Sequence, residues 1–267
     1  MKVGIYYFGF LFIIISSNAV QAQWTFNADN AGYYTDDVAL FSATRRLSLK
    51  EDPTQPNIDK TGQGSDFIYE PSIEAEWTGH NSLGEISFAT DLGGYVFTNQ
   101  TAFSHGLFDF EVAQSFETNT KLSLHYNFVP DLFLGENTFL QLTGKEAEYN
   151  ETLSSHYWSF HIDQNLTQNL VIRLLSRYGL RNYNAPFVYR DTQFWTIGPH
   201  LEWDISDDVA ILVGYHYEKG TAEHGRVTHF ADDLSYTNHY ASTELKIKLL
   251  DDVTLNFDID YEHNLSL

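Results

Sequence analysis

A run of alternating apolar and polar residues at positions 193–220 constrains the fold of this chain more than any other feature. From 195 to 205 the odd positions are Trp, Ile, Pro, Leu, Trp and Ile, whereas the even positions include Thr196, His200 and Glu202. Successive side chains of a β-strand point to opposite faces, so one face is apolar and the other polar. The pattern resumes at 209–219 after a short turn at 206–208. The segment therefore predicts an antiparallel hairpin.

Aromatic residues mark both ends of the apolar row. Trp195 and Trp203 are eight residues apart, which is roughly 26 Å along a strand and about 20 Å in height after a tilt of about 40°. The apolar band of an outer-membrane barrel is about 25 Å tall and is bounded by aromatic girdles. Soluble sandwiches also alternate, but they seldom end their apolar rows in this way. We therefore predict a transmembrane β-barrel with these girdle residues: Trp24, Trp77, Trp195, Trp203 and Tyr217.

The rest of the chain repeats the same kind of strand. Eleven strands are predicted, at 24–33, 66–77, 85–97, 103–116, 121–134, 154–166, 170–183, 192–205, 209–219, 234–249 and 253–261. Short connections alternate with longer ones such as 34–65, 135–153 and 220–233. Short periplasmic turns and longer outer loops are typical of such barrels. The predicted fold class is all-β, an antiparallel up-and-down transmembrane barrel.

The strand count conflicts with the usual topology of these barrels. Bacterial single-chain barrels have an even number of strands, so we expect about twelve. Two interpretations remain open. Either a twelfth strand lies beyond Leu267, which we favour, or Val38–Ser48 forms an extra strand and places the short 35–37 turn on the outer side.

The amino terminus predicts a cleaved signal peptide at residues 1–22. Lys2 precedes an apolar run at 3–15, and Val20-Gln21-Ala22 is a small-residue cleavage site. The barrel is then expected at 23–267. The formal net charge is -21, which argues against nucleic acid as a partner, and the absence of cysteine excludes thiolate metal sites.

The polar faces of the predicted strands supply candidate lumen residues. Three arginines recur every four residues on one strand face, and acids gather on the polar faces of other strands. The residues that we expect to line the lumen and set its selectivity are Arg173, Arg177, Arg181, His200, Glu202, Asp258 and Asp260. Charged rings set selectivity in pores, so an arginine row facing acids would create a transverse field. In the alternative, Arg173 and Arg177 pair with Glu202 and fill a narrow lumen.

Metal and catalytic sites have weaker support. The histidines lack a tight ligand spacing such as HExxH, so no metal or other cofactor is expected. Ser235 and His239 share an outward face, as a barrel phospholipase would require, but four residues span about 13 Å of strand. The pair therefore does not suffice for catalysis, and no catalytic residue is assigned.

Several stretches resemble small outer-membrane β-barrels of Gram-negative bacteria. They are RYGLRNYNAPF, FWTIGPHLEW, LVGYHYEKG and FADDLSYTNHY, and the likeness extends over nearly all of the chain after the leader. The resemblance implies export through the periplasm and residence in the outer membrane. It also implies outer-membrane lipid, lipopolysaccharide and the barrel-assembly machinery as partners.

Three functions are therefore open. We expect a passive, porin-like channel for small solutes. The first alternative is a non-conducting structural or adhesion barrel whose lumen is filled by its own ion pairs. The second alternative is an outer-membrane hydrolase of the phospholipase or omptin kind.

Overall fold

A computed structural model describes residues 22–35, 38, 64–140, 146–222, 235–250 and 253–266. Within these residues the chain forms one antiparallel sheet of eleven strands and two short 3-10 helices, η1 and η2. The strands are β1 (Gln23–Thr35), β2 (Asp66–Asn81), β3 (Gly84–Phe97), β4 (His105–Phe116), β5 (Thr120–Leu140), β6 (Glu146–Thr167), β7 (Leu170–Tyr183), β8 (Thr192–Ser206), β9 (Val209–Ala222), β10 (Tyr236–Leu250) and β11 (Val253–Ser266). The helices are η1 (Thr101–Phe103) and η2 (Phe187–Arg190).

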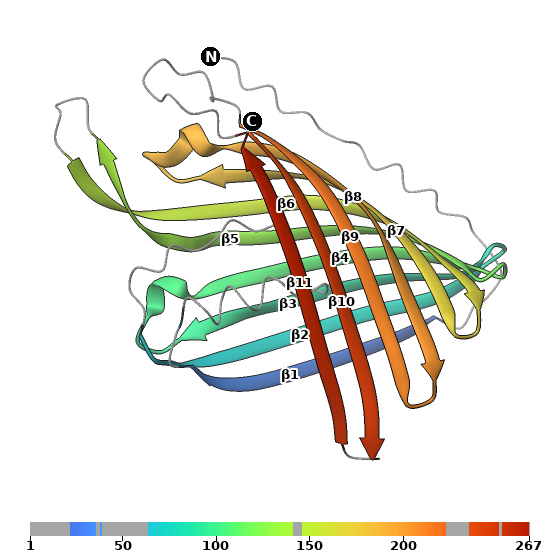
Figure 1. The fold of residues 1–267 in the computed structure, drawn as a ribbon. Coiled ribbons are helices and arrows are strands. Elements are labelled where there is room, and N and C mark those ends of the chain that lie inside the picture. Colours follow the sequence, from blue (N-terminus) through green and yellow to red (C-terminus); the bar gives the residue numbers. More distant parts are fainter. Residues whose placement is uncertain are drawn as a thin grey trace.

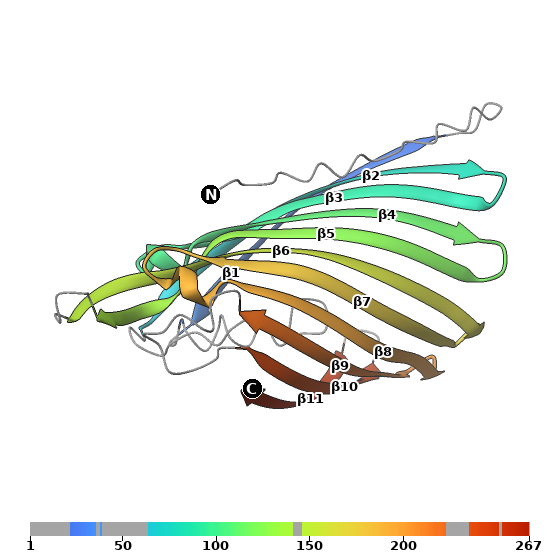
Figure 2. The ribbon, with the colours of Figure 1, turned by 90° about the horizontal axis from the view of Figure 1, so that it is seen from above.

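The strands follow one another in the sheet in chain order, so the topology is a simple up-and-down meander. The sheet twists and curls, and β9–β11 cross in front of β1–β3 in Figure 1, whereas Figure 2 shows the same sheet from above. Among the described residues β1 pairs only with β2 and β11 only with β10, so both are edge strands. The prediction of an all-β, antiparallel up-and-down sheet is confirmed. The expected twelfth strand has no counterpart in the described residues.

The connections differ between the two ends of the sheet. Turns of two or three residues join β2 to β3, β4 to β5, β6 to β7, β8 to β9 and β10 to β11, and this is the short-turn end. The connections at the opposite end, the loop end, include η1 and η2. Of the proposed extra strand at 38–48 only Val38 is described, and the leader at 1–22 lies outside the description except for Ala22.

One predicted loop is wrong. Residues 135–153 were expected to connect two strands, but β5 runs to Leu140 and β6 begins at Glu146. Register shifts lie between Val129 and Leu132 and between Phe133 and Gly135, and Asp131 has a φ of 47°. Such bulges interrupt the alternation of side chains while backbone pairing continues beyond them. Because the alternation is lost at these bulges, the sequence pattern resembles the end of a strand although β5 continues.

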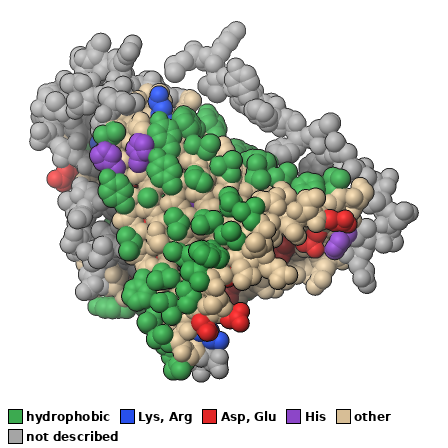
Figure 3. All heavy atoms as spheres, turned by 45° about the vertical axis from the view of Figure 1, so that its right-hand side comes forward, with side chains coloured by type: hydrophobic (Ala, Val, Ile, Leu, Met, Phe, Trp, Pro, Cys, Tyr) green, Lys and Arg blue, Asp and Glu red, His purple; other side chains and the backbone are tan. Residues whose placement is uncertain are grey.

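Alternation gives the sheet two unlike faces. On β8 the side chains of Thr192, Phe194, Thr196 and His200 are buried, whereas Trp195 and Ile197 are exposed. We call the face of Thr196 and its neighbours the inner face and the face of Trp195 the outward face. Exposed hydrophobic side chains cover the outward face (Figure 3), among them Trp24, Ile73, Trp158, Phe160, Leu174, Tyr178, Val213, Leu255, Phe257 and Ile259.

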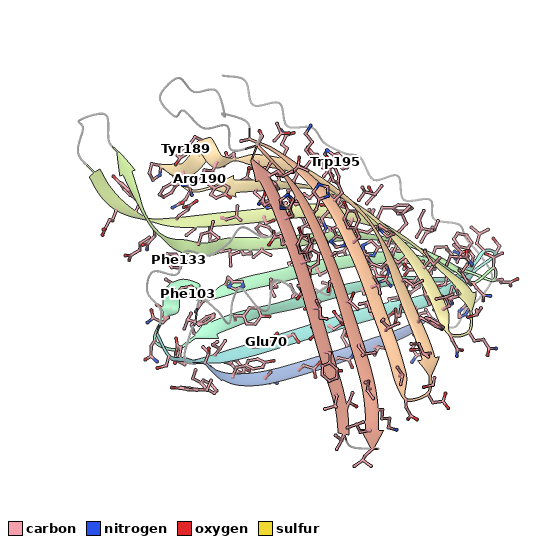
Figure 4. All side chains as sticks on the ribbon, viewed as in Figure 1. Glu70, Phe103, Phe133, Tyr189, Arg190 and Trp195 are labelled. Atoms are coloured by element: carbon pink, nitrogen blue, oxygen red, sulfur yellow. The ribbon has the colours of Figure 1, made fainter. Side chains whose placement is uncertain are left out.

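Apolar side chains also gather on the inner face, but only at the loop end. One cluster joins Ile68, Tyr95 and Phe97 of the sheet with Val38, Phe103 and Phe133. The rings of Phe103 and Phe133 meet edge to face at 5.0 Å and lie together near η1 (Figure 4). A second cluster contains Val129, Leu132, Leu134 and Leu153. The alternation of the strands predicts a polar inner face throughout, and this prediction is wrong at the loop end, where the two clusters lie.

Within the part of the chain that the structure describes, no helix has both the length and the apolar character that a membrane crossing requires.

The two faces predict opposite responses to the same substitution. Leu201→Arg places a charge on the outward face between the sheet centre and Trp203, and we expect it to lower the free energy of unfolding by roughly 2 kcal/mol. The control is Glu202→Arg, because the neighbouring Glu202 is exposed on the inner face of the same strand. We expect this change to cost under about 1 kcal/mol. Urea unfolding of both variants in lipid tests the prediction, and equal losses would contradict the assignment of faces.

Thr196 is not a suitable control. The alternation of the strand alone predicts that an arginine is tolerated at this inner-face position, as on any polar lumen wall. However, Thr196 is fully buried, and its hydroxyl donates a hydrogen bond of 2.7 Å to Glu218. A larger side chain there would displace buried polar groups.

Candidate functional site: the polar inner face

The inner face has two parts that differ in burial and charge. Strands β6–β10 carry a packed part, in which Ser155, Arg177, Arg181, Thr196, His216 and Glu218 are buried. Strands β2–β4 and β11 carry an acidic part whose carboxylates are half-buried or exposed, apart from the buried Asp66 at the loop end. The three predicted arginines belong to the packed part, and Asp258 and Asp260 belong to the acidic part.

Arg181 lies at the centre of a buried cluster. Its Nη1 and Nη2 atoms lie 3.3 Å from Oε1 of Glu218, and both side chains are almost fully buried. The hydroxyl of Tyr236 donates a 2.5 Å hydrogen bond to the same carboxylate and also contacts Arg181. Thr196 donates to the second carboxylate oxygen. The buried charges are therefore paired, as burial in a low-dielectric environment requires.

Glycines make room for the rings beside this cluster. A Cβ atom on Gly179 would lie 2.3 Å from the Phe194 ring, and one on Gly220 would lie 2.2 Å from the Tyr236 ring. The absence of side chains at the two glycines therefore leaves the space that both rings occupy. The guanidinium carbon of Arg181 then lies 4.1 Å from the centre of the Phe194 ring. This geometry is favourable for a cation–π contact.

The other two arginines differ in their exposure to the inner space. The guanidinium of Arg177 lies 4.4 Å from the centre of the Tyr157 ring, and the side chain is buried. Arg173 forms a two-pronged ion pair with Asp163, at 2.6 and 3.0 Å, and 38% of its side chain remains exposed. The predicted ladder therefore exists, but it presents mainly Arg173 to the inner space.

The ion-pair partner of Arg173 differs from the one that the sequence suggested. Asp163 of β6 lies directly opposite Arg173 in the register, whereas Glu202 lies opposite Val171. Glu202 is exposed. Sequence reasoning missed Asp163, Glu218 and Tyr236 as partners, because the alternation of one strand does not reveal its register with the next.

His200, which lies directly opposite Arg173 in the register, forms a close pair with His216. Their Nε2 atoms lie 2.6 Å apart and their rings stack at 4.8 Å. One imidazole must donate and the other accept, so at least one of them is neutral in this contact. Among the described residues no three His, Asp or Glu side chains converge as the ligands of a metal would.

The acidic part brings like charges side by side. Glu74, Asp91 and Asp109 occupy one row across β2, β3 and β4, each directly opposite the next. Glu111 lies beside this row and forms an ion pair of 2.9 Å with Lys121. Carboxylates in direct cross-strand opposition destabilise a sheet. The row therefore concentrates negative charge at a cost in stability.

The edge strand β11 carries the remaining predicted acids. Asp260 accepts a hydrogen bond of 2.6 Å from the hydroxyl of Tyr240, and Glu262 accepts one of 2.7 Å from Asn238. Asp258 lies directly opposite Glu244. At the short-turn end, Asp204, Asp207, Asp208, Lys246 and Lys248 line a hollow of about 520 Å³.

The loop end carries an ion pair between η2 and strand β6. Arg190 of η2, which is labelled in Figure 4, donates to both carboxylate oxygens of Glu151, at 2.6 and 2.7 Å. Burial alone would lower the pKa of Arg190, but the Glu151 carboxylate holds it above its ordinary value. The pair fixes the β7–β8 connection to β6.

The predicted girdle residues lie on the outward face at two heights. Trp24 and Trp77 are direct neighbours on β1 and β2 near the short-turn end, where Trp203 also lies. Trp195 and Tyr217 pack together toward the loop end, with ring centres 5.2 Å apart. A row in direct register continues from Trp195 through Tyr178, Trp158 and Tyr126 to Phe110.

Comparisons with known proteins give likenesses of structure only. No protein-family model matches the chain, and no curated protein matches it. The outer-membrane expressed OmpT of Vibrio cholerae is similar to it with 7% identity and a TM-score of 0.47, over 94% of this chain and 90% of that one. The β domain of the Bordetella autotransporter BrkA is similar with 9% identity and a TM-score of 0.42, over 75% of this chain and 85% of that one.

Proposed function

We propose that this protein is a barrel in the outer membrane of a Gram-negative bacterium and acts as a passive, cation-preferring channel for small solutes. The proposal rests on one observation: the exposed outward face of the sheet is apolar and the inner face carries the charged side chains, which is the reverse of a soluble protein. Apart from one lysine and three histidines, the outward face of the regularly alternating strand segments carries no ionisable group other than tyrosine, whereas the inner face carries the acids and arginines. A soluble sheet protein buries its apolar face, so this arrangement fits lipid outside and water inside.

The different burial of the two inner parts indicates where solutes would pass. Arg177, Arg181 and the buried side chains around them on β6–β10 are packed against one another and leave little room. The acidic residues of β2–β4 and β11 are more accessible. A passage along the acidic part would attract cations, because carboxylate rows line cation-selective pores. Arg173 would mark the opposite side of that passage.

Conductance of the purified protein in planar bilayers tests this function. We expect discrete conductance steps and a reversal potential that shows preference for potassium over chloride in a salt gradient. Screening lengths fall from about 10 Å at 0.1 M salt to about 3 Å at 1 M, so the preference should weaken as salt rises. Inserted protein without steps would reject the channel.

A non-conducting structural barrel is the second candidate, and one observation favours it. The apolar clusters around Phe103, Phe133 and Leu153 cover the inner face at the loop end. If they close the lumen, the bilayer experiment yields inserted but silent protein. Phe103→Ala with Phe133→Ala would then produce conductance steps that the unchanged protein lacks.

A further inference from the structure

The few basic groups of the outward face lie together at one end of the sheet. Outside the bulged part of the β5–β6 hairpin, outward-facing strand positions carry no Asp, Glu or Arg, and the basic residues there are Lys219, His156, His239 and His263. All four lie in the loop-end half of their strands. Three of them are on the neighbouring strands β9, β10 and β11.

Register places these three side chains within one small patch. Tyr217, His239 and His263 follow one another in direct opposition across β9, β10 and β11. Lys219 lies one outward position beyond Tyr217 and directly opposite Trp195 of β8. In Figure 3, histidine side chains and a basic side chain lie among hydrophobic side chains at the upper left. The patch is defined by Trp195, Tyr217, Lys219, His239 and His263.

Neighbouring aromatic residues orient the imidazole of His239. Its Nδ1 atom lies 2.7 Å from the Tyr215 hydroxyl, and its ring lies edge to face with Tyr217 at 5.3 Å. The Nε2 side is therefore directed away from that hydroxyl. Lys219 and His263 are exposed, and the outward neighbours of Lys219 (Trp195, Tyr217, Thr221 and Thr237) include no carboxylate. The patch thus offers one fixed positive charge and imidazole donors beside amphipathic rings.

We propose that this patch binds the phosphorylated headgroup of an outer-leaflet lipid of the lipid A type. The inference rests on the proposed membrane location and goes beyond the proposed channel. Among the described strand positions, the outward face carries no basic group at the short-turn end, so the charge complements an anionic leaflet on the loop side only. Lysine supplies a compact charge for phosphate, charge-assisted hydrogen bonds to phosphate are strong, and Trp and Tyr prefer the headgroup level.

Native mass spectrometry of the detergent-purified protein, titrated with bisphosphorylated lipid A, tests this site. The variant combines Lys219→Gln, His239→Gln and His263→Gln. We expect it to bind lipid A at least fivefold more weakly, because a single Lys or Arg contributes about 1 kcal/mol at an anionic lipid surface and that free energy corresponds to a factor of about five. The control combines Lys246→Gln and Lys248→Gln, which face inward on β10 at the short-turn end, and should change binding less than twofold.

Three results would overturn the proposal. They are equal lipid A binding by the triple variant and the unchanged protein, equal binding of dephosphorylated lipid A, and loss of a subunit contact in the variant with lipid binding retained. The last would make the patch an interface between copies. If the triple variant does not fold, Lys219→Gln alone serves with the same readouts. Fractionation separates the two proposals, because unchanged protein in the soluble periplasm would reject the membrane location itself.

Discussion

Replacing Arg181 by methionine is expected to lower the free energy of unfolding by about 3–5 kcal/mol. The substitution removes the cation that pairs with Glu218, and Glu218 is fully buried. A buried carboxylate without its partner keeps its desolvation cost and loses the attraction that offset it. Urea unfolding in lipid, followed by tryptophan fluorescence, measures the loss. Arg173→Met is the matched control, because 38% of the Arg173 side chain is exposed and its pairing with Asp163 is weakened by solvent.

A second variant separates the charge from the packing. Arg181→Met combined with Glu218→Gln removes both charges and retains side chains of similar size. We expect it to recover most of the stability, because removal of both partners avoids an unpaired buried charge. Equal losses in Arg181→Met and Arg173→Met would contradict the description of a buried charge cluster. Failure of the double variant to recover would assign the effect to packing against Phe194 instead.

The faces of the strands could be predicted from the sequence because a strand has a side-chain period of two. Trp195 and Thr196 therefore had to face opposite ways wherever the strand lay. The same reasoning placed Arg173, Arg177 and Arg181 together on one face of β7, and the structure has them there. The face of a residue depends only on whether its position along the strand is odd or even. The assignment therefore stays correct when the predicted ends of the strand are wrong.

The partners of these arginines could not be predicted, because they depend on the register between strands. Arg181 and Glu218 are 37 residues apart and lie two strands from one another. Bulges after Val129 and Phe133 shift the register between β5 and β6, and no clear sequence pattern marks them. The burial of Arg177 likewise depends on Tyr157 of the neighbouring strand β6. The division into a packed part and an accessible acidic part therefore required the structure.

Neutralising the acidic row is expected to lower the preference for cations and to raise the stability of the fold. Asp91→Asn with Asp109→Asn removes two of the three carboxylates that face one another across β2–β4. If cations pass along this row, their preference over chloride at 0.1 M salt should fall at least twofold. The stability of the fold should rise by about 0.2–1 kcal/mol per relieved pair, since like charges in cross-strand opposition repel. Reversal potentials in planar bilayers and urea unfolding provide the two measurements.

The control for this pair is Asp207→Asn with Asp208→Asn, which removes the same charge from the short turn between β8 and β9. That turn lies outside the row, so it should leave selectivity within about 20% of the unchanged protein and leave stability nearly unchanged, as surface substitutions usually do. Gain of stability with loss of cation preference would indicate that the repulsion is retained for conduction. A stabilised variant with unchanged selectivity would show that Asp91 and Asp109 do not line the permeation path, because carboxylates that line a pore must act on the ions within it.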